Sequence, residues 1–361
     1  MRKPVDFLIV GCGLAALSIA RELQEAGQDW MMIGLQQEGS ASDKSSGIIN
    51  PVTGRRFVKT WNYDRLSMEF LPFYQNLEHQ LGLPLIRESM LMQELQGPEE
   101  ENQWLARTAD PDYTHFLKEG RHLDAFLGKL HTNVRLGLVQ PVFQIDVEPL
   151  LKAWTAYFRR IGRLVDRSFN VAECSFQSEG VIAGDWLVKK GLIFAEGYRM
   201  LENPFFNWMP LWPLKGECMI IDAAGLQLKA AFKSNYTLVP LRGDRYWCGS
   251  SFELNDRSPG NTRLEIGRQL AFLDQKLPSG YAAVSEEWGI RPATRDRRPI
   301  IGPHPMEPRA LVINGFGTKG YSVAPHCARA LARFLTAGEP IPDQMLPGRF
   351  IKKGYVPILP V

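Results

Sequence analysis

A glycine-rich turn between an apolar strand and a helix is the feature that most constrains the fold of this chain. Residues 7–10 form a wholly apolar run typical of a buried strand, and apolar residues then recur at helical spacing over 14–23, before Gly27. A second apolar run occupies residues 30–33. This order of strand, turn, helix and strand predicts a βαβ unit with parallel, buried strands.

The turn has the spacing G-x-G-x-x-A, and each small residue in it has a physical reason. Gly11 permits a tight turn, Gly13 lets the backbone approach a pyrophosphate, and Ala16 lets the helix pack closely on the strand. The helix N-terminus behind the turn favours negative charge. We therefore predict a dinucleotide-binding turn made of Gly11, Cys12, Gly13, Leu14, Ala15 and Ala16.

The acidic residue that usually holds the adenosine ribose, roughly 20 residues after such a turn, is absent. Gly34 stands at that position. We expect Gln36 or Glu38 in the following loop, or backbone groups alone, to take its place. The departure concerns the ribose contacts and leaves the predicted fold unchanged.

Length and charge exclude several classes of protein. The chain has 361 residues, of which 45% are hydrophobic and 22% charged, enough for about two domains with real cores. Its 42 basic and 39 acidic residues give a net charge of +3, too small to indicate binding to nucleic acid or a membrane. The longest N-terminal apolar stretch, residues 7–20, is shorter than the roughly 18 residues of a membrane span.

Five cysteines are scattered through the chain without CxxC spacing, and six histidines show no ligand spacing. This pattern argues against a disulfide framework and against a zinc site. We therefore predict no metal site and expect a reducing compartment, the cytoplasm.

A second glycine-rich turn lies near the opposite end of the chain. An apolar run at 311–313 leads into a turn over 314–320, and a helix is expected from there through Leu335. Between the two turns we expect helices over 63–81 and 146–162, and strand-like runs near Val171 and at 136–139, 180–182, 186–188, 192–195, 213–221 and 236–252.

Six segments, taken together and in order, resemble the FAD-dependent D-amino-acid oxidase superfamily, and most closely its glycine oxidase and sarcosine oxidase branch. The last of them, G-I-R-P-A-T-R-D-R-R-P-I-I-G, is the most specific. The segments are residues 11–16, 45–48, 146–151, 195–197, 213–218 and 289–302.

The resemblance implies an α/β protein with a Rossmann-like FAD-binding domain and a second, mixed-sheet substrate domain. It implies that the FAD-binding domain is discontinuous, over residues 1–60, 137–212 and 285–361. The substrate domain would then comprise residues 61–136 and 213–284.

The resemblance also implies which residues line the flavin, beyond those of the first turn. The second glycine-rich turn would face the pyrimidine end of the ring, where negative charge develops on reduction. These expected FAD-binding residues are Gly34, Gln36, Ser42, Ser45, Ser46, Gly47, Ile48, Val171, Ala195, Gly197, Gly315, Phe316, Gly317, Thr318, Lys319, Gly320 and Tyr321.

The activity that the resemblance implies is hydride transfer from the amine-bearing carbon of a small amino acid or secondary amine to flavin N5, giving an imine that hydrolyses. Arg291 is expected to bind the substrate carboxylate through two parallel hydrogen bonds, and the alternative is a structural salt bridge. Thr318 stands where glycine oxidase has a second arginine, with Lys319 beside it, and Ser322 stands where sarcosine oxidase has its carboxylate-binding lysine.

Two further pairs supply candidates for the same pocket. A second cation comes from Arg55 or Arg56, unless that pair lies on a solvated loop. Tyr236 or Thr237 matches a substrate-facing tyrosine of the relatives, and only one of them can line the pocket because adjacent strand residues face opposite sides.

Two departures from the resemblance bear on mechanism. Trp247 stands where sarcosine oxidase has its oxygen-activating lysine, so the electron acceptor is oxygen or another carrier. Gly289 stands where the covalent flavin link would form, which predicts non-covalent FAD.

Two alternatives use the same fold. One is a tRNA wobble-uridine-modifying FAD oxidoreductase, and the other is an FAD-binding subunit of a heteromeric dehydrogenase. An NAD-dependent dehydrogenase fits poorly, because the second glycine-rich turn would have no role. The sequence leaves the amine substrate and the oligomeric state open.

Overall fold

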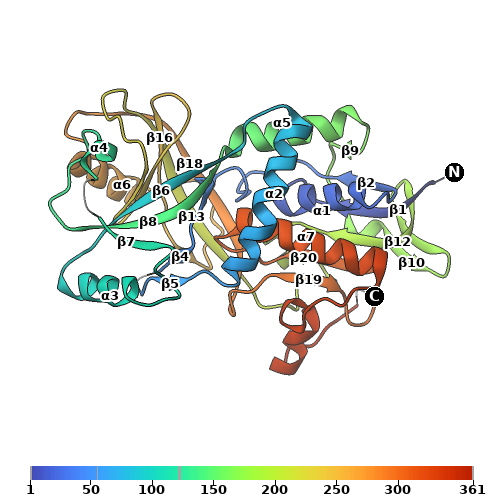
Figure 1. The fold of residues 1–361 in the computed structure, drawn as a ribbon. Helices are drawn as coiled ribbons and strands as arrows, with labels where there is room; N and C mark the ends of the chain where they lie inside the picture. The colour runs from blue at the N-terminus through green and yellow to red at the C-terminus, as the bar shows by residue number, and fades with distance from the viewer. Residues whose placement is uncertain (1, 55, 121–122, 360–361) are drawn as a thin grey trace.

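Two β-sheets, here called sheet A and sheet B, organise the chain in the computed structural model, which describes residues 2–54, 56–120 and 123–359. The sheets occupy opposite ends of the molecule, with sheet B on the left of Figure 1 and sheet A on the right. None of the helices formed by these residues is long and apolar enough to cross a membrane.

Sheet A contains the predicted βαβ unit. Its order is β10-β11-β12-β1-β2-β9, and β20 pairs with β12 and carries β19. The neighbours β9, β2, β1, β12 and β20 run parallel, as the apolar runs predicted. The strands are β1 (Lys3–Val10), β2 (Trp30–Ile33), β9 (Leu164–Val165), β10 (Cys174–Gln177), β11 (Gly180–Ala183), β12 (Trp186–Phe194), β19 (Ile300–Pro303) and β20 (Ala310–Asn314).

Both faces of sheet A are covered, which explains why β1 is apolar throughout. Phe7 and Ile9 pack in the core beneath the helices, whereas Leu8 and Val10 pack in a second core on the opposite face. The first face is covered by α1 (Leu14–Glu25), α2 (Tyr63–Leu81), α5 (Val147–Arg160) and α7 (Gly320–Ala337). Segments with η2 (Gly197–Glu202) and η4 (Pro347–Lys353) cover the second face.

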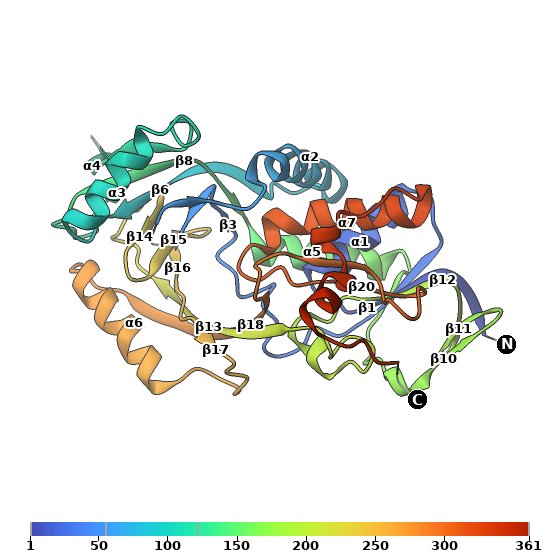
Figure 2. The ribbon, with the colours of Figure 1, turned by 90° about the horizontal axis from the view of Figure 1, so that it is seen from below.

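Sheet B has the order β17-β13-β16-β15-β14-β6-β8-β3, with β18 on β13 and β7 on β8. Helix α6 (Arg263–Lys276) covers its outer face (Figure 2), where Phe272 and Leu273 contact the sheet core. The strands are β3 (Ile48–Ile49), β6 (Ile86–Glu94), β7 (Leu117–Glu119), β8 (Leu136–Ile145), β13 (Leu211–Asp222), β14 (Ala231–Lys233), β15 (Thr237–Pro240), β16 (Arg245–Gly249), β17 (Glu253–Leu254) and β18 (Ala282–Thr294).

Short elements complete the chain, and most of them lie between successive strands of sheet B. Helix α3 packs on β7 and β8 through Trp104, whose indole donates to the Lys118 carbonyl at 3.2 Å. These elements are α3 (Pro98–Thr108), α4 (Asp124–Leu127), η1 (Val171–Glu173), η3 (Asp343–Met345) and the hairpin of β4 (Val52–Thr53) and β5 (Val58–Lys59).

Three expectations about elements differ from the structure. Val171 begins a 3-10 turn rather than a strand, because the side chain of Asn170 accepts the N–H of Ala172 and caps the turn. The runs 186–188 and 192–195 are one strand, β12. Strands β8 and β18 pair in sheet B. The expected boundaries assign most of both strands to the FAD-binding domain, because a strand's own pattern does not encode its pairing partner.

Candidate active site

A large cavity of about 2960 Å³ lies between the two sheets. It is lined by both glycine-rich turns, by the connection over residues 40–50, and by the face of sheet B that α6 leaves free. Pockets for small ligands typically measure about 300–1,000 Å³. The cavity therefore has room for a dinucleotide cofactor and a substrate together.

The N-terminus of α1 opens into this cavity. Gly11 has a φ of +126°, and a Cβ there would overlap the carbonyl oxygen of Ala195, so conformation and space both require glycine. Gly13 caps the helix, no acidic residue lies in its first turn, and the Ser42 hydroxyl accepts the N–H of Leu14 at 3.1 Å. A positive helix end is thus left facing the cavity.

The two glycine-rich turns follow β1 and β20, the two parallel strands that flank β12. The segment after β12 contacts both turns: Gly11 packs against Ala195, and the side chain of Asn314 donates to the Gly197 carbonyl and accepts the N–H of Gly315, both at 2.8 Å. Beyond the second turn, the Tyr321 hydroxyl donates to the Ser42 carbonyl at 2.7 Å. The structure therefore brings the two predicted turns together around one cavity.

The connection over residues 45–48 forms a wall of the cavity. The Ser45 hydroxyl accepts the N–H of Gly47 at 3.2 Å, and the Ser46 hydroxyl accepts that of Ile48 at 3.4 Å. Gly47 has a φ of +75°, and a Cβ there would overlap the carbonyl oxygen of Ile145 on β8. Both serines and Ile48 line the cavity, whereas Gly47 fits the wall against sheet B.

An acidic residue that the sequence pattern missed lies at the predicted ribose end. A Cβ at Gly34 would lie 2.5 Å from the carbonyl carbon of Gly11, so a side chain does not fit there. Gln36 donates to Asp43 at 2.8 Å, and the second carboxylate oxygen of Asp43 is buried without a hydrogen-bond partner. Both side chains line the cavity, as does Val171.

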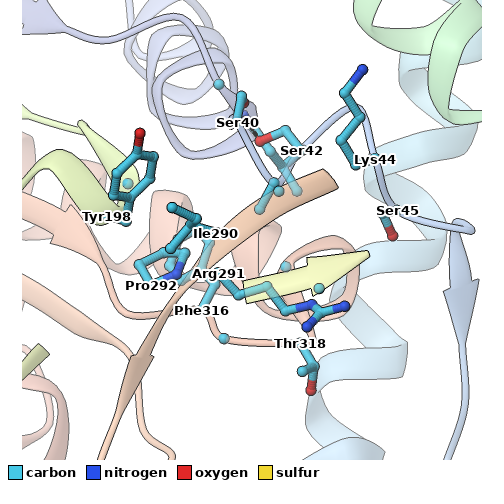
Figure 3. Close-up of a pocket in the computed structure, with 18 of the residues that line it drawn as sticks. Ser40, Ser42, Lys44, Ser45, Tyr198, Ile290, Arg291, Pro292, Phe316 and Thr318 are labelled. Atoms are coloured by element: carbon cyan, nitrogen blue, oxygen red, sulfur yellow. Dashed lines mark hydrogen bonds between the residues drawn. The ribbon is translucent and has the colours of Figure 1, made fainter. Parts of the chain in front are cut away.

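Arg291 extends along the cavity from β18, with its guanidinium on the side of Thr318 (Figure 3). The guanidinium donates to the Ser250 hydroxyl and, at 3.3 Å, to the Ser251 carbonyl. It lies where a Cβ at Gly216 of β13 would be, so glycine makes room for it.

The charge of Arg291 is left without an acidic partner. It forms no ion pair with any residue that the structure describes, and burial lowers its pKa to about 10. Several of its five N–H groups remain available. The expected alternative of a structural salt bridge is therefore absent over the described residues, and the site can bind an anion.

Tyr236 and Thr237 point to opposite sides of sheet B, as adjacent strand residues must. Thr237 lines the cavity. The Tyr236 hydroxyl donates to Glu265 of α6 at 2.8 Å, and its ring packs on Phe272. Tyr236 therefore lies outside the cavity, and Thr237 is the remaining candidate of the pair.

Lys319 and Thr318 both line the cavity at the start of α7. The Lys319 amine donates to the hydroxyl of Thr53 at 2.9 Å and to that of Thr60 at 2.7 Å. Burial lowers the pKa of Lys319 to about 7, and nearby positive charges add to this effect.

Trp247 and Gly289, the two departures from the resemblance that bear on mechanism, carry no free reactive group. Trp247 lines the cavity, but its indole N–H donates to the Lys44 carbonyl at 3.0 Å. A Cβ at Gly289 would lie 2.9 Å from the carbonyl oxygen of Ser40, so that position is closed by the connection between the sheets.

Glu196 and Lys233 are among the charged residues of the cavity lining that the sequence analysis missed, and Arg56 was left as an alternative. Burial raises the pKa of Glu196 to about 7. Lys233 pairs in register with Thr237, a relation that only the pairing of β14 with β15 reveals. Of the arginine pair, Arg56 lines the cavity and is exposed, and Arg55 lies outside the described residues.

Comparison with known proteins decides the family. The model of the family described as DAO, FAD dependent oxidoreductase, matches residues 6–334. The chain belongs to this family. Glycine oxidase of Bacillus licheniformis is 23% identical, with 96% of each chain covered. A bifunctional tRNA 5-methylaminomethyl-2-thiouridine biosynthesis protein of Haemophilus ducreyi is 24% identical over 93% of this chain, which spans 57% of that protein.

The solved structures agree on the fold. Glycine oxidase from Geobacillus kaustophilus superposes with a TM-score of 0.81 at 18% identity, over 94% of this chain and 96% of that one. The predicted fold class and the predicted family are thereby confirmed. The protein is an FAD-dependent oxidoreductase.

The residues of the cavity fit FAD. The N-terminus of α1, whose N-cap residue Gly13 has no side chain and whose first turn has no acidic residue, suits the pyrophosphate. The unpartnered oxygen of Asp43 can accept a hydroxyl of the cofactor, which replaces the acidic group missing at Gly34. Among the predicted cofactor residues, Ala16 and Gly47 do not line the cavity, and their small size lets the elements that form its walls pack closely.

Proposed function

We propose that this oxidoreductase breaks the C–H bond beside the nitrogen of a small amino acid or secondary amine, giving an imine that water hydrolyses. One observation carries the proposal. The half-buried guanidinium of Arg291, without an acidic partner among the described residues, shares a cavity with the N-termini of α1 and α7.

Each part of the cavity has a role in this proposal. Arg291 binds the substrate carboxylate through parallel hydrogen bonds and so fixes the carbon that bears the amine. Ser250 and Ser251 hold the guanidinium, and Thr237 lines the wall of sheet B. The N-terminus of α1 binds the pyrophosphate, and that of α7, with Thr318, favours negative charge on the bound group. FAD, when bound, supplies the acceptor for the two electrons of the substrate.

Three finer features belong to the same proposal. FAD is bound non-covalently, because position 289 offers no side chain. The acceptor is oxygen or another electron carrier, and Trp247 in the place of a lysine favours the carrier. A cytoplasmic location is supported by five free cysteines.

The test uses purified protein with its bound flavin, in an anaerobic cuvette with a panel of small amino acids and N-methyl amino acids. We expect flavin absorbance that is bleached by at least one of them. Arg291→Lys should keep its flavin but raise KM by at least about tenfold, because an ammonium lacks the planar fork of a guanidinium. Flavin reduction followed by stopped flow gives KM and kcat separately.

Arg263→Lys, at an exposed position on α6, is the matched control and should leave both constants unchanged. The proposal fails if the protein holds no flavin, if no amine bleaches it, or if Arg291→Lys behaves as the control does.

A second candidate, oxidation of a modified tRNA base, is favoured by the similarity to the bifunctional Haemophilus ducreyi protein. It requires that the amine be presented by an RNA, whose phosphates would make binding strongly salt-dependent. Tight, salt-sensitive binding of tRNA together with no bleaching by free amino acids would favour this candidate over the first.

A further inference from the structure

The wall of the cavity on sheet B contains a cation in a row of neighbouring residues. Lys233 on β14 pairs in register with Gln93 on β6 and with Thr237 on β15, and Thr237 pairs with Gly249 on β16. Side chains at paired positions share one face of a sheet. All four residues line the cavity.

A second cation, Lys319, lines the same cavity from the start of α7. Lys319 precedes the first turn of α7, and the hydroxyls of Thr53 and Thr60 hold its amine. The positive charges of Lys233 and Arg297 lie close enough to help burial lower its pKa to about 7. Like charges gathered in a partly buried site oppose ionisation unless an anion joins them.

These two lysines lack an acidic partner. Neither Lys233 nor Lys319 forms an ion pair with any part of the chain that the structure describes. The charge of Glu100 on α3 acts on Lys233 without forming an ion pair with it, and its carboxylate accepts the N–H of Gln96 at 2.9 Å. The cavity is thus cationic where Lys319, at the end of the second glycine-rich turn, approaches Lys233 on the wall of sheet B.

Lys233 lies at a distance from Arg291. The Arg291 guanidinium lies over β13, and β14 is three strands away, in the order β13-β16-β15-β14. At about 4.8 Å per strand the two backbones are roughly 14 Å apart. A glycine-sized substrate held by its carboxylate at Arg291 does not extend to Lys233, whereas a longer one does.

We propose that Lys233 and Lys319 form a second anion-binding subsite, so that the substrate is an amine carrying two carboxylates, one at Arg291 and one at the lysine pair. The inference rests on the proposed function, since it takes Arg291 as the first carboxylate anchor. It narrows the substrate class from small amino acids in general to dicarboxylic ones.

The experiment measures binding rather than turnover, by calorimetry on the FAD-loaded protein. The probes are pentanoate and glutarate, which have five carbons each but one and two carboxylates. We expect glutarate to bind at least about tenfold more tightly, because its second carboxylate gains charge-assisted hydrogen bonds. Equal dissociation constants for the two probes in the unaltered protein would overturn the proposal without any variant.

Variants then locate the effect. Lys233→Met and Lys319→Met should each lower the preference for glutarate by at least about threefold and leave pentanoate binding unchanged, and Lys233→Arg and Lys319→Arg should restore it. Lys189→Met, at an exposed lysine of β12, should match the unaltered protein. A glutarate preference that both methionine variants retain would contradict the assignment.

The pH dependence gives an independent readout. Over the described residues, Lys319 faces the hydroxyls of Thr53 and Thr60 and the cations Lys233 and Arg297, so its charge is present below pH 7 and lost as the pH rises through it. The glutarate preference should therefore be up to roughly tenfold larger at pH 6 than at pH 8, and pentanoate binding should change little. A pH-independent preference would count against Lys319.

Failure of this inference is distinguishable from failure of the proposed function. If pentanoate binds and Arg291→Lys weakens it while glutarate gains nothing, the carboxylate anchor stands and the second subsite is absent. If neither probe binds in a way that depends on Arg291, both proposals fail.

Discussion

At the residue scale, the site depends on a glycine that leaves room for a neighbouring side chain. The position of the Arg291 guanidinium is the position that a Cβ at Gly216 would take. The overlap is with the end of a flexible side chain, so an alanine there would displace the guanidinium rather than the backbone. Gly216 is therefore a positioning residue for the proposed carboxylate anchor.

Gly216→Ala should raise KM for the amine substrate by at least about tenfold, because misplacing a binding group by about 1 Å has a cost of that order or more. The flavin content should be unchanged. Stopped-flow reduction and the flavin spectrum measure the two quantities.

Gly267→Ala is the control for this substitution. Gly267 lies on α6 with open space where a Cβ would be, so alanine should leave the kinetics unchanged and stabilise the helix by up to about 1 kcal/mol. Unaltered KM in Gly216→Ala would show that Arg291 is not held as the structure has it.

At the element scale, Asp296 of the motif at residues 289–302 acts as a clamp between the segment after β18 and η4. Asp296 follows β18 and accepts from Arg349 and from Lys353 of η4, each at 3.0 Å. Burial opposes ionisation of Asp296, but these hydrogen bonds outweigh it and hold its pKa well below the usual range. The clamp fixes η4 against the turn that precedes β19.

Asp296→Asn should lower the thermal midpoint at pH 7 by a few degrees, equivalent to about 1 kcal/mol after allowance for partial exposure. A depressed pKa stabilises the fold above the unfolded value of about 4 and loses that contribution as the pH falls through the folded value. The difference in thermal midpoint between the variant and the unaltered protein should therefore become smaller below pH 4. Thermal unfolding at a series of pH values tests this.

Asp112→Asn, at an exposed aspartate before β7, is the control and should leave the midpoint unchanged at every pH. A gap in Asp296→Asn that stays constant down to pH 2 would mean that the carboxylate charge is not the source of the stability.

At the scale of the whole molecule, the cavity joins parts of the chain that are far apart in sequence. The Tyr321 hydroxyl of α7 bonds to Ser42, and the Trp247 indole of sheet B bonds to Lys44. Residues of both sheets line the cavity, so a ligand that fills it contacts both, and its binding energy adds to the stability of the whole fold.

Removing FAD should lower the thermal midpoint by several degrees, since a ligand present at 100 times its dissociation constant contributes about 2.7 kcal/mol. Adding FAD back should restore the midpoint. Riboflavin, which has no pyrophosphate for the N-terminus of α1, should restore less. Identical melting curves with and without FAD would contradict the assigned site.

Much of the nucleotide half could be predicted from the sequence, because its signals are local. The strand, the turn at Gly11 and Gly13, and the helix behind it are adjacent in the chain, and so are those of the turn at Gly315. Spacing and periodicity report such neighbours directly. Arg291 was identified because it lies in a motif, although the motif alone left its partner undecided.

The substrate half was decided by tertiary structure, because its residues meet only through strand pairing. The Tyr236 side chain lies outside the cavity and that of Thr237 lines it, and this assignment depends on which face of sheet B is covered by α6. Lys233 and Lys319 come within reach of one cavity from positions 86 residues apart (319 − 233). Register and partner choice are non-local properties, set by packing of the whole molecule and not by the pattern of any one segment.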